Sequence, residues 1–184
     1  MFVKDTLLTV GAKFGIVHVG ALAYASASVE SGWIPSPVPA IYTDPELADY
    51  RTSLPLFGIE GKRPLNGSFY SDNIEDYYVS PWELGYGRSI SFNHDFIGRD
   101  ALMKAKETAP RTKVTLVLEP DDAAVVVDGH GYYLTYARHR VELAGGNGDL
   151  IGLTHQTATF DTAGTVLALT LINKEHATPA RKSR

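Results

Sequence analysis

The aromatic side chains between residues 70 and 86 are the first group whose types and spacing could do chemistry. Five of them fall within 17 residues: Tyr70, Tyr77, Tyr78, Trp82 and Tyr86. Aromatic rings held beside irregular backbone can form a pocket for a flat ligand. The alternative is that these rings pack a region poor in strands, and composition alone favours that alternative.

Glu30 and His94 are the two ionisable candidates. Glu30 follows a helix-compatible run of small residues and precedes a proline-rich segment, where an isolated acid is usually a solvated helix end. His94 and Asp95 precede a helical pattern, and Asp95 could cap its first turn. The residues alone therefore favour a structural role at both positions.

The sequence lacks the residues or motifs that several kinds of chemistry require. The chain has no cysteine, which excludes disulfides, thiolate metal ligands and cysteine nucleophiles. The histidines fall in no recognised metal spacing, and the glycines near residues 145–152 match neither a dinucleotide fingerprint nor a phosphate loop. No G-x-S-x-G elbow is present, so a serine hydrolase has no support. We therefore expect no metal site.

The composition is typical of a globular protein that does not bind nucleic acid. The 184 residues are 44% hydrophobic and 21% charged, and the net charge of -4 lacks the basic footprint of a general nucleic-acid binder. No apolar run is long enough to span a membrane, and Lys13 and His18 interrupt the N-terminal stretch that could mimic a secretory signal. The absence of cysteine suits a cytoplasmic protein.

Two kinds of elements must position the candidate residues, with a change of pattern near Pro110. Before it, the sequence predicts strands at 10–20 and 86–92, helices at 21–30, 43–53 (capped by Thr43) and 97–107, a rigid segment around Pro35, Pro37 and Pro39, and an irregular region at 58–81. After it, short β-rich runs occur at 114–118, 123–127, 132–136, 141–143, 150–159 and 166–172, with turn signals at Asp128-Gly129 and Asn147-Gly148. We therefore predict an α+β protein with one domain over residues 1–110 and a small antiparallel β domain over residues 111–184.

Three stretches of the chain resemble one family. The block D-F-I-G-R-D-A-L from Asp95 to Leu102 is similar to the D-F-I-G-R-E-A-L of the glycine-cleavage T-protein, and V-E-S-G around Glu30 is similar to its L-E-A-G. The stretches 33–42 and 67–78 look more like the branch of tetrahydrofolate-dependent O-demethylases, which act on aryl methyl ethers such as vanillate or syringate. The resemblance runs from about residue 14 to 178, so the chain is similar to the C-terminal portion of this folate-dependent family.

This resemblance implies a fold, a cofactor and roles for four residues. The fold would be a partial folate-binding T-protein-like α/β domain followed by a β-barrel domain. In the family, the glutamate matching Glu30 hydrogen-bonds the pterin of tetrahydrofolate, and the position of His94 lies near the folate's glutamate tail. Trp82 would line the pocket, and Tyr70 is the candidate catalytic proton donor. The implied reaction moves a one-carbon group from a methoxy-aromatic or other methyl donor to N5 of tetrahydrofolate.

Two hypotheses about function stay open. Family members are much longer, and their N-terminal half supplies much of the folate cavity, so we expect a chain that is incomplete at both ends and does not catalyse alone. The first hypothesis is a fragment of a one-carbon transferase, most similar to an aryl O-demethylase. The second is a non-catalytic folate-binding or interaction module. An incomplete barrel would expose a strand edge, which favours a complementing chain or a homo-oligomer.

Overall fold

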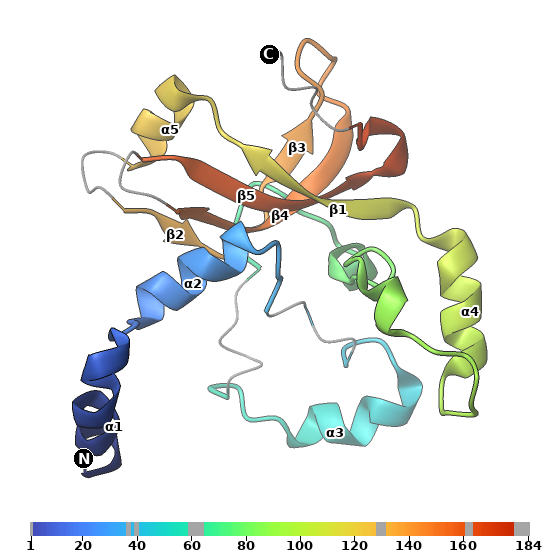
Figure 1. Ribbon diagram of the computed structural model, residues 1–184. Helices are drawn as coiled ribbons and strands as arrows, with labels where there is room; N and C mark the ends of the chain where they lie inside the picture. The colour runs from blue at the N-terminus through green and yellow to red at the C-terminus, as the bar shows by residue number, and fades with distance from the viewer. Residues whose placement is uncertain are drawn as a thin grey trace.

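An antiparallel sheet forms the centre of the protein. The structure is a computed structural model and describes residues 2–35, 38, 41–58, 65–127, 132–160 and 164–178. The sheet contains five strands: β1 (Arg111–Val117), β2 (Leu134–Thr135), β3 (Arg140–Glu142), β4 (Leu150–Thr159) and β5 (Val166–Asn173). Their order is β1-β5-β4-β2, and β3 also pairs with β4 (Figure 1).

Strands β4 and β5 form the buried middle of this sheet. Their register runs from the pair Gly152–Ile172 to the pair Thr159–Val166, and every residue of β4 from Gly152 to Thr159 is buried. The pairing is interrupted between Thr154 and Gln156, which leaves His155 as the extra residue of a bulge. The bulge locally changes which side chains face each side of the sheet.

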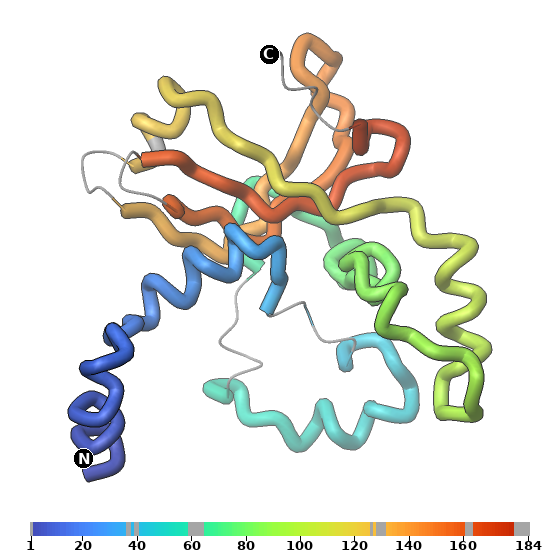
Figure 2. Tube along the Cα trace, viewed as in Figure 1, coloured from blue at the N-terminus to red at the C-terminus, as the bar shows by residue number. Residues whose placement is uncertain are grey.

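The helices are short and lie around the sheet. They are α1 (Phe2–Gly11), α2 (Ala21–Glu30), α3 (Ala48–Ser53), α4 (Arg99–Thr108) and α5 (Pro120–Val127), with 3-10 turns at Ala12–Phe14, Pro45–Leu47, Ile74–Tyr77, Tyr86–Ser89 and Lys174–His176. Only α2 packs extensively on the sheet among these described helices, where it touches β2, β4 and β5. In Figure 2 the chain from α1 leads into α2 at the left of the view, while α3 lies at the bottom and α4 at the right.

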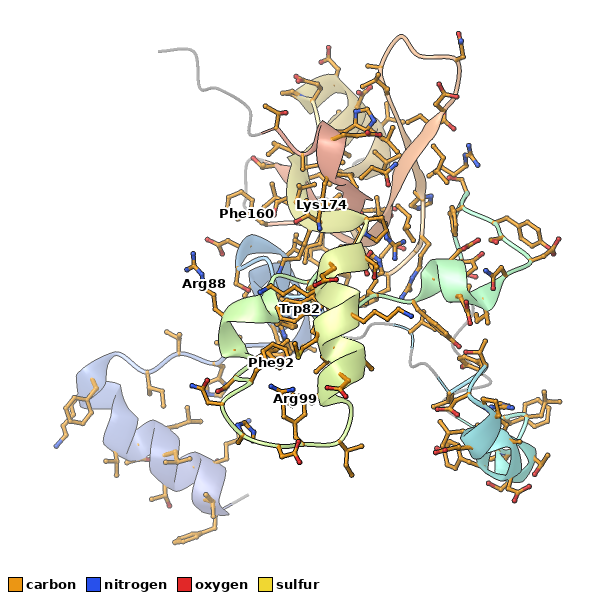
Figure 3. The ribbon with its side chains drawn as sticks, turned by 90° about the vertical axis from the view of Figure 1, so that its right-hand side faces the viewer. Trp82, Arg88, Phe92, Arg99, Phe160 and Lys174 are labelled. Atoms are coloured by element: carbon orange, nitrogen blue, oxygen red, sulfur yellow. The ribbon has the colours of Figure 1, made fainter. Side chains whose placement is uncertain are left out.

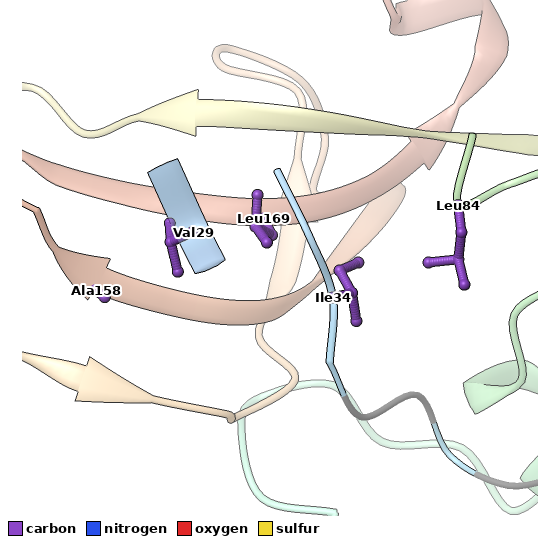
Figure 4. Packing of buried hydrophobic residues seen from close by; sticks show 5 residues of the cluster. All are labelled: Val29, Ile34, Leu84, Ala158 and Leu169. Carbon is purple, nitrogen blue, oxygen red and sulfur yellow. The ribbon is translucent and has the colours of Figure 1, made fainter. Parts of the chain in front are cut away.

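The main hydrophobic cluster joins α2 to the sheet. Val29 of α2 packs with Ile34, Leu84, Ala158 and Leu169, and all five are buried (Figure 4). A second cluster forms around the buried residues Phe69, Tyr77 and Leu153. The end of α2 and the segment that contains Leu84 therefore meet at one core, although they lie far apart in the sequence.

The fold class is α+β, as predicted, but the prediction of a barrel is wrong. The sheet is open: its edge strands β1 and β2 do not pair with each other in the described residues. The division into residues 1–110 and 111–184 stays a prediction.

Three predicted strands are not strands in the structure. Residues 10–20 end α1 and continue as a 3-10 turn and irregular chain, and residues 86–92 contain the turn Tyr86–Ser89. Both segments have strand-like patterns but no neighbouring strand within the described chain, and a strand needs such a partner for its backbone hydrogen bonds. Residues 123–127 belong to α5 instead, because Pro120 and two aspartates in its first turn favour a helix start.

Other predictions agree closely with the structure. The helix 21–30 and the strand 150–159 have the predicted bounds. The caps differ: Asp44, not Thr43, accepts from the backbone N–H of Glu46 at 2.9 Å, and Gly98, not Asp95, precedes α4. Gly148 has the positive φ of 83° that its turn signal implies. The Asp128-Gly129 turn and the prolines 37 and 39 lie outside the described residues.

Candidate functional site

Glu30 is the last residue of α2, and its side chain lies in solvent. Its neighbour Val29 is 0% exposed and is held in the main cluster, so the helix turns Glu30 outward from the core. No hydrogen bond or ion pair from the described residues reaches the Glu30 carboxylate. The structure thus offers an unpartnered acceptor at the end of a helix whose backbone is anchored on the sheet.

A buried amide on β4 holds α2 in place. Gln156 is 0% exposed and donates from Nε2 to the carbonyl of Ala25 at 2.9 Å and to the hydroxyl of Ser28 at 3.0 Å. The Ser28 hydroxyl itself donates to the same carbonyl at 2.7 Å. These hydrogen bonds form only when α2 lies at one distance from β4. They therefore also fix the end of the helix that carries Glu30.

His94 and Trp82 belong to one row of aromatic rings. Trp82 stacks on Phe92 with a centroid distance of 6.1 Å and an interplanar angle of 13°. Phe92 is 6.0 Å from Phe96, and the Phe96 ring is 5.4 Å from His94. Figure 3 shows Trp82 and Phe92 beside α4. The structure thus brings two of the four predicted site residues together, with His94 exposed at the outer end of the row.

Two cationic side chains lie beside this aromatic row. Arg99 lies 5.8 Å from the Phe92 ring, and Lys106 lies 5.7 Å from the Trp82 ring. Trp82 is itself firmly held, because its indole N–H donates to the carbonyl of Leu102 at 2.8 Å. A Cβ atom on Gly87 would come within 2.7 Å of the same ring. Trp82 therefore fixes the segment of residues 82–92 against α4.

Tyr70 lies apart from the other three predicted residues, in an open pocket of about 550 Å³. Its lining includes the apolar residues Phe69 and Leu153 and the charged residues Asp76 and Arg111. Neither Glu30, Trp82 nor His94 lines it. The predicted residues thus fall into three separate places in the described chain: the end of α2, the aromatic row and this pocket.

The Tyr70 hydroxyl is engaged within its own loop. It donates to Asp72 Oδ1, and this hydrogen bond raises the pKa of Tyr70 above its usual value. The phenol is protonated at neutral pH, as it already is at the ordinary tyrosine pKa of 10.0. The ring is 75% exposed, so the described residues leave it open to solvent.

A buried ion pair between Arg111 and Glu83 supports the pocket, and the sequence patterns did not reveal it. Arg111 Nε donates to Glu83 Oε1 at 2.7 Å, and its Nη atoms donate to the carbonyls of Tyr78 at 2.7 Å and Asp76 at 3.3 Å. The other Glu83 oxygen accepts from the backbone and hydroxyl of Ser80 at 2.8 and 3.0 Å. Because the pair spans 28 positions, no local spacing could have identified it.

His155 is the second buried polar residue that the sequence patterns missed. It is 2% exposed in the β4 bulge, and neither ring nitrogen has a hydrogen-bond partner among the described residues. Burial, and then the positive charges of Arg138 and Arg111, lower the pKa of His155 from 6.5 to about 3. The imidazole is therefore neutral at physiological pH. Its burial follows from its place in the buried part of β4, where every residue from Gly152 to Thr159 is buried.

In the part of the chain that the structure describes, His, Asp and Glu side chains form no cluster of three that could hold a metal ion. Over those same residues, no helix has the length and apolar character needed to cross a membrane.

Comparisons with known proteins relate the chain to two enzymes, although no protein-family model matches it. Syringate O-demethylase of Sphingobium sp. (strain NBRC 103272 / SYK-6) is 31% identical over 188 aligned positions, which take in 96% of this chain and 41% of that enzyme. Sesamin methylene transferase of Sinomonas sp. (strain No.22) is 34% identical over 121 positions, which take in 64% of this chain and 26% of that enzyme. The chain therefore belongs to the T-protein-like family, in the branch that contains these two enzymes, and it spans about two fifths of the length of the first.

Proposed function

We propose that this chain is part of a tetrahydrofolate-dependent one-carbon transferase that works in the cytoplasm, and that the substrate of the complete enzyme is an aryl methyl ether. The observation that carries the proposal is the similarity to syringate O-demethylase, which extends over 96% of the chain. The blocks around Glu30 and at 95–102 support it independently, because they resemble the T-protein. Tetrahydrofolate supplies the nitrogen that accepts the one-carbon group.

Glu30 is the residue of this chain that best fits the folate. A carboxylate can accept two N–H bonds from the amino-pyrimidine edge of a pterin, which gives orientation as well as affinity. The Glu30 carboxylate is exposed and has no partner among the described residues, while Gln156 and Val29 fix the helix that carries it. The backbone that carries the acceptor is therefore in place before any ligand arrives.

Trp82 and His94 contribute in a different way in this proposal. The Trp82 indole N–H is already donated to Leu102, and the ring stacks on Phe92, so its role is to shape the wall rather than to bind by hydrogen bonds. His94 stays exposed at the end of the aromatic row, close enough to Phe96 for ring contact at 5.4 Å. We assign it to the outer end of the site, near the folate's glutamate tail.

Tyr70 is the proposed proton donor to the leaving aryl oxygen. General-acid catalysis of this kind needs a hydroxyl that is protonated at neutral pH, as a tyrosine is at its ordinary pKa of 10.0, and that turns from Asp72 toward the leaving oxygen. The departing oxygen then leaves as a phenol. The role depends on the arrangement of the complete enzyme, because Tyr70 and Glu30 line no common pocket in the described chain.

We propose further that the chain does not catalyse alone, because it spans only about two fifths of syringate O-demethylase. The described residues provide one acceptor and one aromatic wall, and the open pocket at Tyr70 lacks the enclosure that excludes water from a reaction. The second candidate function is a non-catalytic folate-binding module that a partner chain or a second copy completes. The exposed Glu30 fits both candidates.

Calorimetric titration with tetrahydrofolate under anaerobic conditions tests the folate proposal. We expect the wild type to bind, Glu30→Ala to bind at least about tenfold more weakly, and the matched control Glu46→Ala, another exposed acid, to bind as the wild type does. Equal affinity of Glu30→Ala and wild type would remove the assigned role of Glu30. Absence of binding by the wild type would contradict a folate site on this chain.

A turnover assay with syringate or vanillate and tetrahydrofolate separates the two candidate functions. We expect no demethylated product from the chain alone. Product formed by the chain alone would refute its dependence on a second component. Product formed only after a second polypeptide is added would favour the transferase over the binding module.

A further inference from the structure

The turn between β3 and β4 carries a motif that the proposed function does not use. It contains Gly146, Asn147 and Gly148, and residues 142–150 are all exposed. Figure 1 shows this turn projecting from the sheet at the top of the view. Asparagine is a thermolabile residue, and before a glycine it can lose its side-chain amide without an enzyme. The backbone nitrogen of the glycine attacks the side-chain carbonyl carbon, and the missing Cβ of glycine leaves that approach open.

The atoms that would react at Asn147 are free of other contacts. Neither the Asn147 side chain nor the backbone N–H of Gly148 has a hydrogen-bond partner in the part of the chain that the structure describes. A hydrogen bond nearby runs from Arg140 Nη2 to the Gly148 carbonyl at 3.4 Å, and it does not involve the attacking nitrogen. The peptide that joins Asn147 to Gly148 can therefore rotate for attack without losing a hydrogen bond of its own N–H.

The chain has a second Asn-Gly pair, Asn66-Gly67, whose backbone is held. The backbone N–H of Arg138 donates to the Asn66 carbonyl at 2.5 Å. A Cβ atom added to Gly67 would overlap the Arg138 carbonyl oxygen, which also accepts from the N–H of Phe69 at 2.9 Å. Attack requires the peptide between Asn66 and Gly67 to rotate, so these contacts must open first. Both asparagines are exposed, and the two pairs differ in how firmly the backbone is held.

We propose that Asn147 is a site of spontaneous modification, where deamidation produces aspartate and isoaspartate, and that Asn66 keeps its amide while the protein is folded. The Gly148 nitrogen forms a bond to Asn147 Cγ, and the bond from Cγ to Nδ2 breaks. Nδ2 leaves as ammonia with the proton that the Gly148 nitrogen gives up, and a succinimide ring remains. Water then opens the ring: its hydroxyl adds to one ring carbonyl carbon, and its proton returns to the nitrogen. Opening at Cγ gives aspartate, and opening at the main-chain carbonyl gives isoaspartate.

The modification changes a segment that borders the Tyr70 pocket. Either product places a new negative charge in the turn, and isoaspartate also adds a methylene group to the main chain. The turn leads directly into Leu150, which lines the pocket together with Arg140. Because Arg140 also bonds to the Gly148 carbonyl, a longer main chain at residue 147 displaces one of its partners.

Ageing of the full chain tests this proposal. One sample is incubated folded, at physiological temperature and mildly alkaline pH, and another is incubated in concentrated urea. Peptide mapping by mass spectrometry follows the loss of the amide at Asn147 and Asn66, and an isoaspartyl methyltransferase labels isoaspartate. We expect Asn147 to convert at least about tenfold faster than Asn66 in the folded protein, and the two rates to agree within about threefold in urea, where the backbone contacts are lost.

Asn147→Gln is the matched control, because its longer side chain disfavours the five-membered ring. This variant should lose the isoaspartate label from the folded protein. Retention of the Asn147 amide in the folded protein, over the time in which the urea sample converts, would overturn the proposal. Equal rates at the two asparagines in the folded protein would do the same, and so would a label that persists in Asn147→Gln. Each result is independent of whether Glu30 binds folate.

Discussion

The substitution Arg111→Met tests whether the buried ion pair stabilises the segment 76–83, whose carbonyls Arg111 also binds. Arg111 and Glu83 have side chains that are only 16% and 5% exposed, and their closest atoms are 2.7 Å apart. Methionine keeps most of the volume but leaves the Glu83 carboxylate buried without its cation. Removal of one partner from a buried pair costs about 3–5 kcal/mol of the free energy of unfolding, since the remaining charge stays desolvated.

Arg140→Met is the matched control for this substitution. Arg140 also bonds through Nε to a glutamate, Glu142, at 3.0 Å, but these side chains are 38% and 42% exposed. Solvent screens such a pair, so we expect a loss of about 1 kcal/mol or less. The two variants thus change the same residue type in pairs of similar length, and they differ in burial.

Urea unfolding, followed by tryptophan fluorescence and circular dichroism, gives the free energies of unfolding. A third variant, Arg111→Met with Glu83→Gln, removes the unpaired charge while a side-chain oxygen can still accept from Ser80. We expect it to recover part of the loss of the single variant. Equal losses for Arg111→Met and Arg140→Met would refute the reasoning, and so would a double variant less stable than Arg111→Met.

Three further predictions concern the sheet. Gly152→Ala should cost about 3 kcal/mol in urea unfolding, because the added Cβ would be forced against the Leu171 carbonyl oxygen of β5; wild-type stability would contradict the close approach of the strands. Burial depresses the pKa of His155 to about 3, below the unfolded value of 6.5, so its contribution to stability is present above pH 6.5 and is lost as the pH falls toward 3. Between pH 6.5 and about pH 5 the wild type should lose about 1.5 kcal/mol more than His155→Leu, and parallel pH profiles would show that the imidazole is not buried when folded. Gln156→Leu should cost about 1–2 kcal/mol, since it removes the bond to Ala25, and it should speed hydrogen exchange in α2; an unchanged exchange rate would mean that packing alone holds the helix.

Helices and strands that are determined by the residue pattern within the segment itself could be predicted from the sequence. Strand β4 has the predicted bounds, because its run of apolar and threonine residues suits a strand buried on both faces. Helix α2 likewise ends where Ser31 and Gly32 follow Glu30. In contrast, residues 123–127 have a β-rich composition, but Pro120 and the two following aspartates begin a helix before them. In this segment the residues that favour a helix start, rather than the β-rich composition, determine the secondary structure.

Elements that depend on a neighbour could not be predicted in this way. Residues 10–20 and 86–92 have strand patterns, yet the described chain gives neither segment a strand to pair with. The candidate site shows the same limit. Glu30 was predicted from a short motif and Trp82 from an aromatic-rich stretch, whereas the pairing of Arg111 with Glu83 and the burial of His155 depend on tertiary contacts that no local spacing encodes.

The place of β1 at the sheet edge also has a consequence for the order of folding. Strands β4 and β5 are neighbours in the sequence and can zip together as a hairpin, but β1 must wait for β5, since Arg111 pairs with Asn173. The chain between β1 and β5 is long, so contacts between these two strands form more slowly than contacts between strands that are neighbours in the sequence. We therefore expect the hairpin to form in the folding transition state and β1 to dock afterwards. Until it docks, the chain carries an unpaired strand that can join another molecule, so refolding yield should fall as protein concentration rises.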